Sequence, residues 1–412
     1  MPDIVKKISI KNSSGNLVDY DIGADATNVA YDNNTNIKDK IDTKFDTSNL
    51  GVANGAASLD SNGKVPSSQL DIDLTSYMAK GVDYVTAGQL SGSTLGIRAT
   101  AEGEDVVASG ANAHAEGNGT IAYGSNSHAE GSGTNASYSN SHAEGSGTLA
   151  SGSGSHAEGG GTSASNSNAH AEGAGTNASG SNSHAEGSGS RATNNNAHAE
   201  GTGTQASGPN SHAEGQGSTA AVTGSHAEGT ATFSNGISAH TEGTNTTANQ
   251  NYSHAEGEYT FSNGTAAHTE GYYTTASNDY SHAEGYCTNA VGRCTHAEGY
   301  KTTAEGNGAH AEGGYSVEGY ASNYAKGQNS HAEGFKTTAM NHTSHAEGVE
   351  TVAYGTVTHA EGCKTTAYSS ASHAEGYYTC ASGIGAHAEG GYTTVSGEEG
   401  TFALGENSHA EG

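Results

Sequence analysis

Histidine and glutamate recur together along most of this chain, in the tetrapeptides His-Ala-Glu-Gly and His-Thr-Glu-Gly. Of the 22 histidines, only His342 lies outside this motif. An imidazole and a carboxylate two residues apart are suited to acid–base catalysis or to ligating a metal ion. A catalytic site, however, needs one pair of groups that differs from all others. These motifs follow each other every 14 residues, from His114 to His310 and again from His331 to His387, so their spacing indicates a structural role.

The 14-residue repeat consists of two similar halves of seven residues. Each half reads Ser/Thr-x-Ala-x-Gly-x-x, and the second half carries Ser or Thr six residues after the histidine and Ala in nearly every case two residues later, as in Thr120 and Ala122. Two longer spacings contain substitute copies, residues 324–327 and 402–405, each seven residues before the next motif histidine. Another copy, residues 100–103, lies 14 residues before His114. The array therefore begins near residue 99.

Five alternating residues that end in glycine, followed by two turn residues, predict a short strand and a corner. Two such strands and two corners close one coil of a solenoid. Alternation places Ser/Thr, Ala and Gly on one face of each strand and the two remaining residues on the other. The small residues must face inward, because a coil of 14 residues encloses almost no volume. We predict an all-β fold, a parallel β-roll (β-solenoid) with 14 residues per coil.

The composition excludes several classes of protein. Only 32% of the residues are apolar and tryptophan is absent, so an ordinary globular core cannot form. Fifteen basic residues stand against 44 acidic ones, and the net charge of −29 argues against binding nucleic acid or anionic membranes. No apolar run approaches the ~20 residues of a membrane span, so we expect no membrane insertion. The four cysteines are too irregularly spaced for a disulfide framework, and we expect free thiols.

One outward face of the predicted coil is constant and the other varies. The first strand always presents His and Glu outward, whereas the second presents pairs such as Ile121 and Tyr123. A narrow roll buries too little apolar surface to stand alone, so we expect the constant face to meet another protomer. Like residues would stack ~4.8 Å apart there, and imidazoles donating to carboxylates would relieve the repulsion. This predicted interface ladder includes His114, Glu116, His128, Glu130, His142, Glu144, His184, Glu186, His198 and Glu200.

A metal is the alternative interpretation of the same face, because three histidines around a trimer axis are a ligand set for zinc or iron. Every coil offers that set, however, and the glutamate of each coil supplies a hydrogen-bond partner instead. We therefore predict no metal and no cofactor.

Tyrosine is concentrated in the second half of the chain, where 15 of the 21 tyrosines follow Asn251. Many occupy the corner after His-x-Glu-Gly, where earlier repeats have small residues such as Ser132 and Gly133. Two interpretations remain open: bulky corners that pack on a neighbouring protomer, or an aromatic flank on which host glycans stack. The candidate glycan-binding residues are Tyr272, Tyr273, Tyr286, Tyr300, Tyr377 and Tyr378.

The paired heptads resemble the head repeats of YadA-like trimeric autotransporter adhesins, in which Ser-Val-Ala-Ile-Gly takes the place of Ser-His-Ala-Glu-Gly. Residues 401–405, Thr-Phe-Ala-Leu-Gly, come closest to that apolar version. The Ser-His-Ala-Glu-Gly form itself resembles arrays in phage and prophage tail fibres. Residues 50–66, LGVANGAASLDSNGKVP, are similar to a linker common in tail fibres. The resemblance covers the array and this linker, and it implies a homotrimer.

With this resemblance, the chain divides into three predicted regions. Residues 1–49 form a small α+β anchor that attaches to the particle, with an alternating stretch at residues 4–10 and a helical one where Ile37, Ile41 and Phe45 fall four apart. Residues 50–98 form the linker or collar, and residues 99–412 form the repeat solenoid.

The function implied is that of a structural tail fibre, a receptor-binding protein of a phage or phage-tail-like particle that mediates attachment to the bacterial surface. Its partners would be a tail or baseplate protein, contacted through the N-terminal region, and a glycan or protein of the bacterial surface. The alternative is a fibre-borne polysaccharide depolymerase with a site between protomers. No Gly-x-Ser-x-Gly, His-Glu-x-x-His or P-loop motif occurs, so we expect no enzyme.

Overall fold

The computed structural model describes residues 6–11, 14–22, 30–32, 35–36, 85–89, 95–314, 322–394 and 397–412. Every regular element among these residues is a β-strand, and none is a helix that could span a membrane. The chain divides into two units, Met1–Thr75 and Ser76–Gly412. The predicted helix around Ile41 and the linker at 50–66 lie outside the described residues.

The first unit contains two short antiparallel pairs. Strand β1 (Lys6–Lys11) pairs with β2 (Leu17–Ile22), with Lys6 opposite Ile22 and Lys11 opposite Leu17. Strand β3 (Ala30–Asp32) pairs with β4 (Thr35–Asn36). Strand β1 overlaps the alternating stretch predicted at residues 4–10 and extends one residue beyond it.

The second unit is a stack of coils that begins with β5 (Val85–Gln89) and β6 (Thr100–Ala108). Each following coil has a long strand, from a motif histidine to the fourth residue after it, and a two-residue strand that starts seven residues after that histidine. Long strands run from β7 (His114–Asn118) to β43 (His373–Tyr377), with shorter versions at β35 (His310–Gly313), β45 (His387–Gly390) and β49 (His409–Glu411). Two-residue strands run from β8 (Ile121–Ala122) to β44 (Cys380–Ala381), followed by β48 (Phe402–Ala403).

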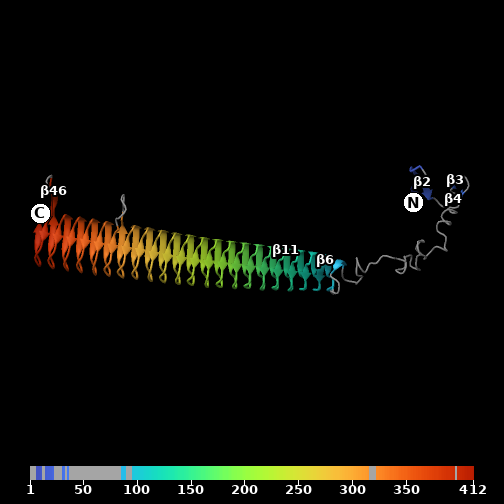
Figure 1. Ribbon diagram of the computed structural model, residues 1–412, viewed down its shortest axis with the longest axis horizontal. Coiled ribbons are helices and arrows are strands. Elements are labelled where there is room, and N and C mark those ends of the chain that lie inside the picture. The colour runs from blue at the N-terminus through green and yellow to red at the C-terminus, as the bar shows by residue number, and fades with distance from the viewer. Residues whose placement is uncertain are drawn as a thin grey trace, which may run out of the picture. The chain divides into compact units, whose positions relative to one another are not determined.

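Both kinds of strand stack in parallel and in register, each residue on its equivalent 14 positions later (Figure 1). His142 pairs with His156 and Glu144 with Glu158 in the sheet of long strands. Asn135 pairs with Leu149 in the sheet of two-residue strands. This arrangement confirms the predicted all-β solenoid with 14 residues per coil. At ~4.8 Å per coil, the stack from residue 99 onwards is on the order of 100 Å long.

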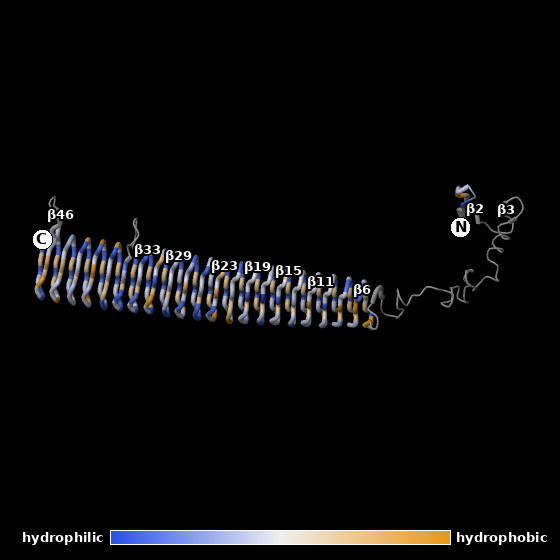
Figure 2. Tube along the Cα trace, in the orientation of Figure 1, coloured by the Kyte–Doolittle hydropathy of each residue, from blue (hydrophilic) through white to orange (hydrophobic). Residues whose placement is uncertain are grey.

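The interior of the coil holds only small side chains. Ala115, Ala122 and Thr120 are completely buried, and Ser127 is 2% exposed. Its Oγ donates to the carbonyl oxygen of Gly124 at 2.6 Å, which satisfies a polar group inside the coil. Figure 2 shows hydrophobic and hydrophilic segments alternating within every coil, with no separate hydrophobic layer. The prediction that Ser/Thr and Ala face inward is therefore confirmed.

The glycine of each His-x-Glu-Gly motif allows the coils to stack closely. At Gly145, φ is +109° and a Cβ atom would lie 2.1 Å from the carbonyl oxygen of Gly159 in the next coil. No other residue fits, because backbone occupies that space and the conformation disfavours L-residues. The corner before each motif also has positive φ, as at Asn126, whose Oδ1 accepts from Asn112 Nδ2 of the preceding coil at 3.1 Å.

Two coils are longer than 14 residues, and the extra residues follow Gly314 in one and Gly391 in the other, each four residues after a motif histidine. After Gly391, β46 (Tyr392–Thr394) and β47 (Gly397–Glu399) form an antiparallel hairpin. The coils then resume in register, with His310 paired to His331 and His387 to His409. The substitute copies form the expected two-residue strands, β36 (Tyr324–Ala325) and β48.

Candidate functional site

The predicted ladder of histidines and glutamates forms two columns along the long strands. The imidazole rings of His184 and His198 stack with centroids 4.8 Å apart and an angle of 2° between their planes. Stacking of this kind is continuous from His128 to His387, and the terminal pairs His114–His128 and His387–His409 meet edge to face. The side chain of His184 is 36% exposed and that of Glu186 is 43% exposed. The constant face thus lies at the surface of the single chain.

Within a coil, each imidazole lies close to its own glutamate without donating to it in most coils. The distance from His Nε2 to Glu Oε2 is 3.9 Å for His184 and Glu186. The Nε2 atoms of His142, His184 and most other ladder histidines are buried without a hydrogen-bond partner. His114, at the first rung, does lie within hydrogen-bonding distance of Glu116, at 3.4 Å. The coil spacing brings the rings face to face, and ring stacking fixes the direction of Nε2. The expected donation to carboxylates is therefore weaker than predicted.

The electrostatics of the ladder favour neutral imidazoles. Burial lowers the pKa of His184 below its usual 6.5, and the neighbouring His170 and His198 lower it further. Glu186 and Glu172 raise that pKa, but their influence is smaller. The same order of causes holds for His142 and His226. At neutral pH the face therefore presents uncharged stacked rings beside carboxylates.

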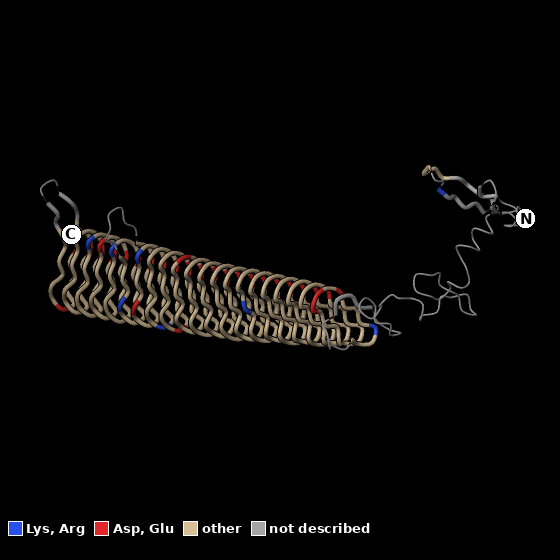
Figure 3. The backbone as a smooth tube through the Cα atoms, turned by 45° about the vertical axis from the view of Figure 1, so that its right-hand side comes forward, with Lys and Arg blue, Asp and Glu red and all other residues tan. Residues whose placement is uncertain are grey.

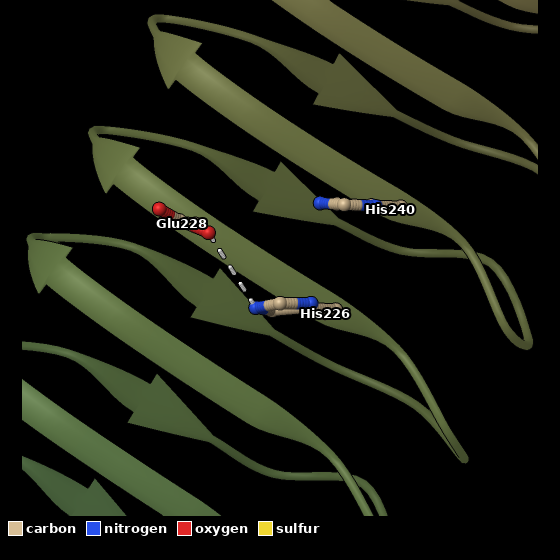
Figure 4. Close-up of side chains that lie close together, drawn as sticks. All are labelled: His226, Glu228 and His240. Atoms are coloured by element: carbon tan, nitrogen blue, oxygen red, sulfur yellow. Dashed lines mark ion pairs between the residues drawn. The ribbon is translucent and has the colours of Figure 1, made fainter.

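Neighbouring coils also assemble groups that a metal ion could use. The ligand atoms of His226, Glu228 and His240 lie within 4.8 Å of one another, and similar sets recur along the ladder. Figure 4 shows the two rings side by side on adjacent coils, with Glu228 in contact with His226 at 4.0 Å. Because the ring planes differ by only 10°, the nitrogen lone pairs run parallel and do not converge on one point. This geometry suits pairing of one imidazole with one carboxylate better than a zinc site.

The predicted tyrosines fall into two separate groups at the corners after the long strands. Tyr272, Tyr286 and Tyr300 stack in one column, with centroids 5.2 and 4.9 Å apart. Tyr273 stacks on Tyr259, which was not among the predicted residues, at 4.7 Å, and meets Tyr272 edge to face. Tyr377 and Tyr378 contact each other several coils further along the stack. The structure therefore brings four of the six predicted tyrosines together.

Stacking changes what these tyrosines can offer to a ligand. Both faces of the Tyr286 ring are covered, one by Tyr272 and the other by Tyr300. The ring edges remain accessible, since Tyr286 is 41% exposed and Tyr273 is 48% exposed. A sugar ring therefore cannot lie flat on the middle of this column, and contacts to it must be made through ring edges and hydroxyl groups.

The corners themselves change character along the stack, a feature that the sequence interpretation missed. The fifth residue after the histidine has positive φ in the described coils of regular length; it is glycine from Gly119 to Gly217 and a larger residue from Ala231 to Tyr378. We call the fourth and fifth residues after the histidine in the later coils the distal corner strip. It comprises Glu258, Tyr259, Tyr272, Tyr273, Tyr286, Cys287, Tyr300, Lys301, Phe335, Lys336, Val349, Glu350, Cys363, Lys364, Tyr377 and Tyr378. The replacement of glycine at one repeat position was the available signal in the sequence.

Similarity to known proteins adds no second line of evidence about this face or the strip. A scan against models of known protein families and a search of curated proteins both found no match. The fold class of the chain is therefore assigned from its own repeat and from the coil that the repeat forms.

Proposed function

We propose that this chain is a receptor-binding fibre of a phage or phage-tail-like particle, in which the solenoid forms a shaft and its distal coils contact the bacterial surface. The observation that carries the proposal is the change along an otherwise uniform stack. Early coils have glycine or asparagine at both corners, whereas coils after residue 230 carry tyrosine, lysine, cysteine and phenylalanine. A purely structural rod has no need for that change. The N-terminal unit, Met1–Thr75, would attach the fibre to its particle.

We further propose that three chains associate through the His/Glu columns. These columns are constant in sequence and about a third to a half exposed, whereas the outward residues of the two-residue strands vary, as in Asn135 and Leu149. An invariant exposed face suits contact with an identical face. Mass measurement of the purified protein should return three chains of 41.1 kDa. A stable monomer at micromolar concentration would contradict the association.

The attachment function predicts binding to cells without cleavage of their polysaccharide. The fluorescently labelled full chain should bind in a saturable manner to some strains in a panel of bacteria with different surface polysaccharides. Purified polysaccharide from a bound strain should show no increase in reducing ends. An increase would support the depolymerase instead, and a lack of binding to every strain would contradict attachment through this chain.

A further inference from the structure

We propose that the distal corner strip is a binding site for an anionic polysaccharide, one that carries carboxylate or phosphate groups. The inference rests on the proposed attachment function and adds the chemical class of the ligand and the residues that contact it. Three observations carry it: the backbone conformation of the strip, the distribution of positive charge along the solenoid, and the pairing of that charge with aromatic rings.

The backbone conformation shows that bulky side chains at the strip have a cost. Tyr273, Lys301 and Lys364 have φ of 54°, 54° and 57°, in the left-handed region where glycine is favoured. An L-residue is less stable there than in an unstrained conformation. Eight early coils avoid this cost with glycine at the same position. Strained residues of this kind cluster at functional sites; they occur at the strip and also at the corner before each motif, as at Tyr252 and Val357.

Positive charge in the solenoid is scarce and gathers at the strip. Residues 99–412 contain six basic residues, and three of them, Lys301, Lys336 and Lys364, occupy the same position of the coil. Figure 3 shows blue and red segments along one edge of the distal coils. In a chain with a net charge of −29, these three lysines are half of the basic residues of the solenoid, and Glu258 and Glu350 lie in the same strip.

Each of these lysines lies over an aromatic ring of its own strip. The Nζ atom of Lys301 is 5.3 Å from the centre of the Tyr300 ring, that of Lys336 is 5.2 Å from Phe335, and that of Lys364 is 4.4 Å from Tyr378. Such contacts hold an ammonium group in place, and Lys364 Nζ also donates to the hydroxyl group of Tyr378. Lys336 also pairs with Glu350 at 3.1 Å, with 45% of the lysine side chain exposed. The strip therefore presents positioned cations at a fixed axial spacing.

The spacing and the stacking together favour an acidic glycan over a neutral one. Lys336 and Lys364 lie two coils apart, which is about 10 Å at ~4.8 Å per coil. This separation suits a polymer with one acidic group per pair of sugars. Neutral sugars are usually held by stacking on open aromatic faces, and the middle of the tyrosine column has none. Ammonium groups and phenol edges instead recognise charge and hydroxyl groups.

The test measures binding of the full chain to three immobilised polymers: hyaluronate with one carboxylate per pair of sugars, lipoteichoic acid with phosphates, and neutral dextran. We expect binding to one or both anionic polymers and none to dextran, and the stronger of the two anions identifies the acidic group. The substitutions Lys301→Gln, Lys336→Gln and Lys364→Gln together should weaken that binding at least about tenfold and reduce its salt dependence.

A matched control removes the same charge elsewhere, with Arg191→Gln, Arg293→Gln and Lys326→Gln together, and should change the affinity less than about twofold. Thermal melting of both variants checks that the solenoid is intact. Equal losses of affinity in the two variants would overturn the proposal, because they would show non-specific attraction. The proposal would also fail if the wild-type protein bound neither anionic polymer. If the lysine variant still binds bacterial cells like the wild type, this proposal fails while the attachment function stands. Loss of all cell binding by the wild type would instead overturn the attachment function.

Discussion

Gly145→Ala is expected to break the stack at the coil that contains it. The new Cβ atom would lie 2.1 Å from the carbonyl oxygen of Gly159, and φ at this position is +109°. Backbone on both sides leaves no side chain to move aside, so the two coils must separate. We expect a loss of at least about 4 kcal/mol in the free energy of unfolding, in the range reserved for severe steric defects. Thermal melting followed by circular dichroism measures the loss, and limited proteolysis locates it.

Gly147→Ala is the matched control, two residues further along the same coil. Its φ is +65° and a Cβ atom there meets nothing within 4 Å. The later coil that contains Ala231 already has alanine at this position, with φ of 53°. The control should therefore cost only about 1 kcal/mol. Equal destabilisation by the two substitutions would contradict the close approach of neighbouring coils at Gly145.

Acidification from pH 7.5 to pH 5.5 is expected to lower the melting temperature of the solenoid. Burial, followed by neighbouring imidazoles, lowers the pKa of fourteen ladder histidines from 6.5. The folded chain then binds fewer protons than the unfolded chain. Stability is fully present above the unfolded pKa and is lost as the pH falls through it towards the lower folded pKa. Because small losses add over many coils, we expect a decrease of about 5 °C or more.

The range from pH 7.5 to pH 5.5 is chosen because it includes the reference pKa of histidine, about 6.5. A variant with His184→Gln, His198→Gln, His212→Gln and His226→Gln should show a weaker dependence on pH than the wild type. A melting temperature that rises on acidification would mean that pairing of imidazolium with carboxylate outweighs burial, and would reverse the sign derived from the ladder.

The coil could be predicted from the sequence because its interior accepts so few side chains. The positions of Ala115 and Thr120 are completely buried and cannot accept much larger side chains. The repeat of small residues therefore indicates which positions face inward. The same argument located the substitute strand at Tyr324, where the spacing of the histidines is irregular. In-register stacking followed from the equal length of successive repeats.

The behaviour of outward side chains could not be predicted in the same way. The ring of His184 is oriented by the rings above and below it, a contact between residues 14 positions apart that the pattern does not specify. The covered faces of Tyr286 have the same origin. Positive φ at Lys301 is a property of the corner, and nothing about a lysine signals it.

The two lengthened coils, with extra residues after Gly314 and after Gly391, make this protein a natural scaffold for displaying foreign peptides. In both cases the next coil still pairs in register, His331 with His310 and His409 with His387. All the remaining coils have an equivalent corner. A peptide placed there behind the Gly-Gly pair of residues 313–314 would project from a rigid rod, and copies in different coils would be separated by whole multiples of ~4.8 Å. The same chain could thus present several epitopes at chosen distances from one another.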